Sequence, residues 1–143
     1  MPATSFDSWT WRCGTAVADL MARIGVGPMA RLTTTGWITR RTHTVPVVPI
    51  DHGGGRWLVA PYGPVAWVRN ARVNPTVSLR RGRSTARYTA CEVGPEDAGP
   101  VLQRYVQVAS RARSSFTASV DAPTEAFIAE ADRHPVFELR AIA

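Results

Sequence analysis

Apolar residues first recur at helical spacing and later at the alternating spacing of strands. Between residues 6 and 24 they lie three or four positions apart, which predicts an amphipathic helix packed on a sheet. Gly25 ends this pattern. A helix lying on a membrane surface is the alternative. It is disfavoured because the polar side mixes Asp19 with Arg23 and so lacks a basic face.

Further along, short β-branched or alternating segments are bounded by Gly and Pro, as strands are. The expected strands are residues 29–35, 42–51, 56–60, 76–81, 84–93 and 135–140. Pro46 and Pro49 restrict the second of them to a sheet edge or a bent path, because proline cannot donate a hydrogen bond to a neighbouring strand. Turns at residues 52–55 and at Gly82 are expected to join strands into hairpins.

Helices are expected between strands, at residues 65–72, from Pro95 onward and at residues 124–132. Hairpin connections without a regular strand–helix–strand alternation favour an α+β, mainly β fold over a doubly wound parallel sheet. The pattern predicts an antiparallel sheet or barrel of about six strands with flanking helices. A chain of 143 residues is expected to form one domain, with residues 1–28 as N-terminal helix and linker and residues 29–143 as the barrel.

The sequence also indicates the cellular compartment that we expect for the protein. No apolar run is long enough to span a bilayer, and the first residues lack the basic-then-apolar order of a signal peptide. We therefore expect a cytoplasmic protein in which Cys13 and Cys91 are free thiols. Two cysteines and three scattered histidines do not make a structural zinc site, so no metal is expected.

The basic residues are all arginine, 17 in number, and they concentrate in the middle of the chain. Residues 31–87 contain ten arginines against one acid, Asp51, which gives this stretch a net charge of +9, whereas the whole chain has +6. A general preference for arginine explains why lysine is absent, but not why acids avoid the middle. The stretch therefore predicts an anion-binding surface, because the guanidinium fork pairs well with phosphate and carboxylate.

Reactive side chains, in contrast, form no recognisable catalytic motif. The sequence lacks the GxSxG, HExxH, P-loop and GxGxxG patterns. His43, His52 and His134 stand in separate predicted elements and are expected to be surface or packing residues, and Asp51 has no second acid near it. If the protein is an enzyme, a bound cofactor has to supply the reactive chemistry.

Six segments occur in one order and spacing. They are LTTTG at 32–36, TVPV at 44–47, RWLVAPYG at 56–63, WVRNAR at 67–72, LRRGR at 79–83 and EAFIAEADRHPVFEL at 125–139. This ordered set resembles the actinobacterial deazaflavin-dependent nitroreductase family, small proteins related to flavin reductases of the split β-barrel type. The resemblance covers most of the chain from residue 31 onward.

The resemblance implies a split β-barrel and a cofactor, coenzyme F420, which is a deazaflavin with a phosphodiester and an oligoglutamate tail. Many members pass hydride from the reduced form, F420H2, to electron-poor small molecules such as quinones, activated enones or lactones, and nitro compounds. The polyanionic tail would suit the arginine-rich stretch. Residues 110–116 contain no tyrosine, where nitro-reducing relatives have a tyrosine cluster, so the acceptor stays open. Split barrels often form homodimers, so a homodimer is a further possibility.

Site residues carry over position by position. In the family a basic pair and then a Ser or Thr grip the phosphate, whereas here Thr39 is followed by the pair Arg40 and Arg41. The ring is expected beside the strand end at residues 59–63 and beside a W-x-x-N on the following helix. The implied cofactor-binding residues are Thr39, Arg40, Arg41, His43, Val45, Pro46, Val59, Ala60, Pro61, Tyr62, Gly63, Trp67 and Asn70.

Tyr62 is the candidate for a proton donor or a wall of the substrate pocket, because it would lie beside the ring. The spacing of three puts Trp67 and Asn70 on one face of a helix, where they could line the cofactor or, alternatively, be a core residue and a helix-end polar residue.

Two rival functions remain at this stage. The same barrel could bind FMN or haem, or carry its cofactor without turnover. A different class, a nucleic-acid-binding module, would use the arginines on the phosphate backbone and Trp37 or Trp57 for stacking on bases. No sequence pattern of a known nucleic-acid-binding fold supports this second rival, so no nucleic-acid partner is expected.

Overall fold

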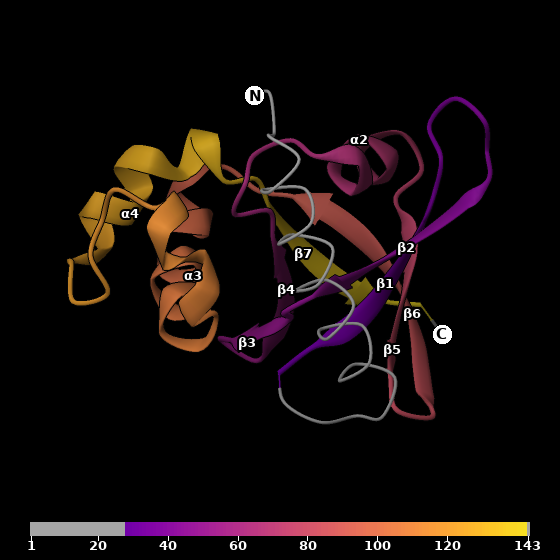
Figure 1. The fold of residues 1–143 in the computed structure, drawn as a ribbon, viewed down its shortest axis with the longest axis horizontal. Coiled ribbons are helices and arrows are strands. Elements are labelled where there is room, and N and C mark those ends of the chain that lie inside the picture. Colours follow the sequence, from indigo (N-terminus) through magenta and orange to yellow (C-terminus); the bar gives the residue numbers. More distant parts are fainter. Residues whose placement is uncertain (1–27, 143) are drawn as a thin grey trace, which may run out of the picture.

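The computed structural model describes residues 28–142, so the helix expected between residues 6 and 24 lies outside the described residues. The strands are β1 (Ala30–Thr35), β2 (Thr42–Val47), β3 (Ile50–His52), β4 (Gly55–Val59), β5 (Thr76–Arg81), β6 (Ser84–Glu92) and β7 (Val136–Ala141). The helices are α2 (Ala66–Val73), α3 (Pro95–Val108) and α4 (Thr124–Glu130), with 3₁₀ turns η1 (Ser110–Ser115) and η2 (Ala131–Arg133). Figure 1 shows their arrangement.

All the described strands join one curled antiparallel sheet in the order β2-β1-β5-β6-β7-β4-β3. The sheet has seven strands rather than six because the segment expected at 42–51 divides at Val48 and Pro49. Its two parts then lie at opposite edges of the sheet, where a strand needs no second ladder of hydrogen bonds. The expected restriction of this segment to a sheet edge is thereby confirmed, as is the mainly β barrel with flanking helices.

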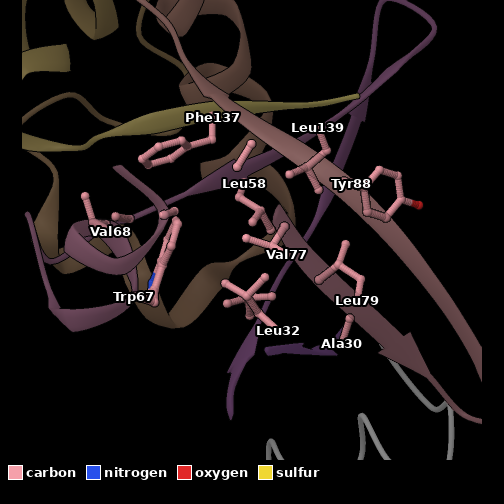
Figure 2. Packing of buried hydrophobic residues seen from close by; sticks show 14 residues of the cluster. Ala30, Leu32, Leu58, Trp67, Val68, Val77, Leu79, Tyr88, Phe137 and Leu139 are labelled. Atoms are coloured by element: carbon pink, nitrogen blue, oxygen red, sulfur yellow. The ribbon is translucent and has the colours of Figure 1, made fainter. Parts of the chain in front are cut away.

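One hydrophobic cluster fills the inside of the curled sheet. The β1 side chains Ala30, Leu32 and Thr34 point inward and are buried, whereas those between them are partly exposed. Helix α2 closes the cluster with Trp67, whose ring lies 5.5 Å from that of Phe137 (Figure 2). The alternation of strand residues thus directs every second side chain into the barrel.

A second hydrophobic cluster lies on the outer face of the β4 and β7 end. There Val59 and Val136, neighbours across the β4–β7 pair, pack against α3, α4 and η1. Helices α3 and α4 lie side by side on this part of the barrel (Figure 1). Helix α3 begins with Pro95 and has Glu96 and Asp97 in its first turn, as predicted. The turn η1 was not predicted, since of its residues only Ala112 is buried and no apolar periodicity marks it.

Close packing of α3 on α4 depends on Gly99. A Cβ atom at this buried position would overlap the side chain of Ile128 on α4. We expect Gly99→Ala to lower the free energy of unfolding by about 1–2 kcal/mol, because overpacking outweighs the better helix propensity of alanine. Chemical denaturation measures this loss. Adding Ile128→Ala should remove the overlap, so the double variant should lose less than the sum of the single losses; strict additivity would contradict the packing account.

Candidate functional site

The loop between β1 and β2 folds tightly around Gly36. Its N–H donates to the Arg41 carbonyl at 2.7 Å, and the Arg40 N–H donates to the Gly36 carbonyl at 3.1 Å. A Cβ atom on Gly36 would lie 2.9 Å from Thr39 Oγ1 and 3.1 Å from His43 Nε2. The absence of a side chain at Gly36 therefore lets Thr39, Arg41 and His43 converge.

Arg40 takes an unusual conformation at the tip of this loop. Its φ of 61° lies in the left-handed region, which costs a residue with a side chain about 1–2 kcal/mol. The Thr39 hydroxyl oxygen accepts the Arg41 N–H at 3.3 Å, so its own proton stays available for donation. Trp37 and Ile38 on the same loop are exposed, 47% and 71% respectively. Strain at an exposed basic residue is typical of a functional loop.

A buried amide on α2 holds the base of the loop. Asn70 is 3% exposed; its Nδ2 donates to Thr34 Oγ1 at 3.1 Å, and its Oδ1 accepts the Trp37 N–H at 3.1 Å. Asn74, one turn later, reaches the carbonyls of Thr35 and Gly36 at 3.4 Å. Both ends of the Asn70 amide are thus engaged by the protein, so its effect on any ligand runs through the loop.

The connection between β4 and α2 is the second part of the predicted site. Val59 and Ala60 are buried, in the outer and the inner cluster respectively, so their side chains anchor the connection. Gly63 has a φ of 94°, which glycine adopts without strain. Its N–H donates to the Ala60 carbonyl at 3.3 Å. Tyr62 is 63% exposed and is the side chain here that most plainly faces solvent.

Tyr62 has an electrostatic effect on a second phenol, that of Tyr105 on α3. Burial raises the pKa of Tyr105, and the charge of the Tyr62 phenol raises it further. Tyr105 therefore stays protonated at neutral pH and keeps a hydroxyl proton that it can donate. The sequence had offered only Tyr62 as a proton donor.

The sequence did not predict a buried pair of ionisable side chains, Glu130 and His134, next to the β4–α2 connection. His134 Nδ1 lies 2.8 Å from the Pro61 carbonyl oxygen, and its Nε2 lies 2.8 Å from Glu130 Oε1. Burial alone would raise the pKa of Glu130, but hydrogen bonds from the Ala118 N–H, His134 and the Thr117 N–H together hold that pKa below its ordinary value. The signal in the sequence was the spacing of four between Glu130, which ends α4, and His134, which follows the 3₁₀ turn η2.

The structure divides the arginines of the middle stretch into engaged and free ones. Arg72 makes a bidentate pair with Glu92 at 2.7 and 2.8 Å, and Arg56 contacts Asp51 and Tyr88. Within residues 28–142 no hydrogen bond or ion pair of the side chain is found for Arg40, Arg41, Arg69, Arg83 and Arg87. Two of these free cations stand on the β1–β2 loop, and Arg69 stands on the exposed side of α2.

The predicted site residues thus fall into two groups with α2 between them (Figure 1). One group is the β1–β2 hairpin, with Thr39, Arg40, Arg41 and His43 exposed and with Val45 and Pro46 partly buried on β2. The other group is the β4–α2 connection, residues 59–63. Trp67 and Asn70 lie on the buried side of α2, the face their spacing predicts, and brace the structure from within.

The donor set of the hairpin fits a phosphodiester. Within residues 28–142 the guanidinium groups of Arg40 and Arg41 have no protein partner, and the Thr39 hydroxyl and the His43 imidazole belong to the same hairpin, close to Gly36. Such donors form charge-assisted bonds with phosphate. In residues 28–142, no three His, Cys, Asp or Glu side chains group as metal ligands would. No helix in the same range is long and apolar enough to cross a membrane. Cys91 is a free thiol there, and Cys13 lies outside the described residues.

The first prediction for this site concerns the amide. Asn70→Ala leaves the Thr34 hydroxyl and the Trp37 N–H without partners, so we expect a loss of about 1–3 kcal/mol in the free energy of unfolding and faster hydrogen exchange in the β1–β2 loop. Asn74→Ala is the matched control, since its hydrogen bonds are longer, 3.4 Å, and it should cost less. Equal effects of the two substitutions would contradict the assigned role of Asn70.

The second prediction concerns the buried carboxylate. The pKa of Glu130 is lower in the folded protein than its ordinary value of 4.5, so its ionisation stabilises the fold above that value, and this contribution is lost as the pH falls through the lower folded value. Glu130→Gln should therefore unfold at a lower temperature than the wild type at neutral pH, and the gap should shrink as the pH falls below 4.5. The exposed Asp132→Asn is the control; a gap for Glu130→Gln that is independent of pH would contradict the prediction.

Several solved structures of other proteins share the fold of this chain. A solved F420-H2 dependent reductase (FDR-A) is 22% identical, with a TM-score of 0.55, over 79% of this chain and 94% of that one. A structure described as a domain-swapped dimer is 21% identical, with a TM-score of 0.57, over 95% of this chain and all of that one. The heme storage protein HutZ from Vibrio cholerae is 16% identical, with a TM-score of 0.53, over 81% and 82% of the two chains. At such identities the likeness shows the shared fold.

A family model places the chain more closely. The model described as F420H(2)-dependent quinone reductase matches residues 8–128, which is most of the sequence. This match agrees with the resemblance carried by the six ordered segments. The chain therefore belongs to the F420H2-dependent quinone reductase family, oxidoreductases whose hydride donor is reduced coenzyme F420.

Proposed function

We propose that the protein binds coenzyme F420 with its phosphodiester on the β1–β2 loop and its ring beside the β4–α2 connection. The observation that carries this proposal is the pair Arg40 and Arg41, two cations without partners among residues 28–142, on a strained loop that Asn70 holds by a hydrogen bond. A loop held in place before the ligand arrives loses little entropy on binding. In this placement Arg69, on the exposed side of α2, is a further cation for the oligoglutamate tail.

The reaction proposed is reduction of an electron-poor small molecule. Reduced coenzyme F420, when bound, supplies a hydride to the acceptor. The family name favours a quinone, and activated enones or lactones and nitro compounds are the further acceptors we propose. The chain contributes orientation: the buried Ala60 and Val59 anchor the connection at its base, so that ring and acceptor can be held in a near-attack geometry.

A proton has to follow the hydride when a quinone or an enone is reduced. The exposed Tyr62 is the proposed donor or pocket wall, since it stands on the connection where the acceptor would stack. The Tyr105 phenol, on which Tyr62 acts electrostatically, stays protonated at neutral pH. Substitution of Tyr62 by Phe distinguishes the two roles, because a wall keeps its function without the hydroxyl whereas a donor does not.

The test of the binding mode compares two pairs of arginines. We expect Arg40→Ala with Arg41→Ala to weaken binding of F420 by about tenfold or more, because charge-assisted bonds to the phosphate are lost. The control is Arg83→Ala with Arg87→Ala, which removes the same charge from the β5–β6 hairpin. The β1–β5 register puts the turn of that hairpin at the opposite end of the sheet from Gly36. Titration followed by the fluorescence of the coenzyme measures both.

Several outcomes would contradict the proposal. Equal weakening by the two pairs would show a general charge effect instead of a site. Failure of the wild type to bind F420, together with a purified protein coloured by FMN or haem, would favour the rival ligand on the same fold. For activity, reduced F420 and menadione should give back the absorbance of oxidised F420 only when protein and acceptor are both present.

A homodimer is the remaining part of the proposal. The structure described as a domain-swapped dimer shares the fold of this chain, and we propose that two copies of the present chain associate as well. Light scattering coupled to size exclusion measures the mass of the particle directly. A monomer over the whole working range of concentrations would remove the dimer from the proposal and leave the F420 site unaffected.

A further inference from the structure

Three segments of the chain meet at the buried imidazole of His134. They are the β4–α2 connection at Pro61, the segment after η1 at Phe116 and the end of α4 at Glu130. His134 and Glu130 each have side chains 4% exposed. The Glu130 carboxylate accepts the Thr117 N–H at 3.0 Å and the Ala118 N–H at 2.7 Å, which ties α4 to the segment after η1. The Phe116 ring stacks on the imidazole, with centroids 4.0 Å apart and planes 23° apart.

Each ring nitrogen of this imidazole faces an oxygen. The Pro61 carbonyl has lone pairs only, so His134 Nδ1 carries a proton and donates it at 2.8 Å. On the other side Nε2 lies within hydrogen-bond distance of Glu130 Oε1, at 2.8 Å. Glu130 is held in turn by the two backbone amides. The ring therefore has one orientation in which all its partners are satisfied, and Phe116 prevents it from tilting.

The bond from His134 to the Pro61 carbonyl differs from the other hydrogen bonds of the β4–α2 connection because it comes from a side chain. Residues 60–64 otherwise hold together through backbone bonds, from the Ala60 N–H to the Pro135 carbonyl at 2.8 Å and from the Gly63 N–H to the Ala60 carbonyl at 3.3 Å. In the part of the chain that the structure describes, the His134 bond is the only one from a side chain to these five residues. The Pro61 carbonyl thus links the exposed Tyr62 turn to the second hydrophobic cluster.

We propose that His134, oriented by Glu130, is a positioning residue that sets the β4–α2 connection for the cofactor ring and the acceptor. It acts through the Pro61 carbonyl and touches neither substrate nor cofactor. This inference rests on the proposed function, because the connection matters for catalysis only if the ring lies beside it. A small displacement there would change hydride transfer strongly, since misplacement by about 1 Å can cost about a hundredfold in rate.

Two amide substitutions separate the two sides of the ring. His134→Asn places its amide nitrogen near the position of Nδ1, so the bond to Pro61 can persist while the bond to Glu130 is lost. His134→Gln reaches the position of Nε2, so the bond to Glu130 can persist while Pro61 loses its donor. Both lose the stack on Phe116, so they are matched for general damage to the core.

We expect His134→Gln to weaken F420 binding by about tenfold and to lower kcat further, whereas His134→Asn should stay within about threefold of the wild type in affinity. Hydrogen exchange of residues 60–65 in the protein without cofactor should rise in the Gln variant and not in the Asn variant. Thermal unfolding of both checks that they are folded. Equal affinity and equal exchange in the two variants would overturn the proposal.

The two proposals can fail separately. If the wild type binds no F420, the proposed function fails, and the exchange comparison still decides whether His134 holds the connection. If either variant does not fold, the wild type alone provides the test. Positioning predicts that exchange at residues 62–65 is already slow without F420 and changes less than about threefold when F420 binds. A connection that becomes protected only on binding would overturn the proposal.

Discussion

The β1–β2 loop keeps its shape because one buried amide, that of Asn70, hydrogen-bonds two groups: the Thr34 hydroxyl and the Trp37 N–H. Asn70 joins Thr34, inside the barrel, to the backbone of Trp37, at the start of the loop. A buried polar group without a partner costs about 1–3 kcal/mol, so the loop and α2 are strongly coupled. Arg40, an exposed cation at the tip of the loop, can keep its strained conformation because Asn70 holds the base of the loop.

The same helix separates the two halves of the proposed cofactor site. On one side lie the cations of the loop, and on the other lies the β4–α2 connection with Tyr62. Each half is fixed from behind by a buried polar group, Asn70 for the loop and His134 for the connection. This division suits a ligand with an anionic tail at one end and a flat ring at the other, because each end requires a different chemistry. The reactive atoms come from the cofactor, so the polypeptide mainly provides placement.

Much of the fold could be predicted from short-range pattern. The alternation in Ala30–Thr35, the proline at the start of α3 and the Gly-rich turn at residues 52–55 all act within a few residues, so their outcome depends little on the rest of the chain. The division of the segment at 42–51 was foreseen as a bend at its prolines. That its halves occupy opposite edges of the sheet depends on how the sheet curls, and this is a long-range result.

In the candidate site, too, some features follow from local pattern and others from packing between distant segments. The order of residues already establishes the chemistry that is present: an arginine-rich middle with one acid, a W-x-x-N on a short helix and no nucleophile motif. Which arginines stay free among residues 28–142 depends on folding, because acids such as Glu92 are distant in sequence and neutralise Arg72 only in the folded chain. It also brought Glu130 and His134 to Pro61, more than sixty residues earlier, where burial turns two ordinary polar residues into an anchor. Contacts of this kind depend on packing between distant segments, which local patterns do not encode.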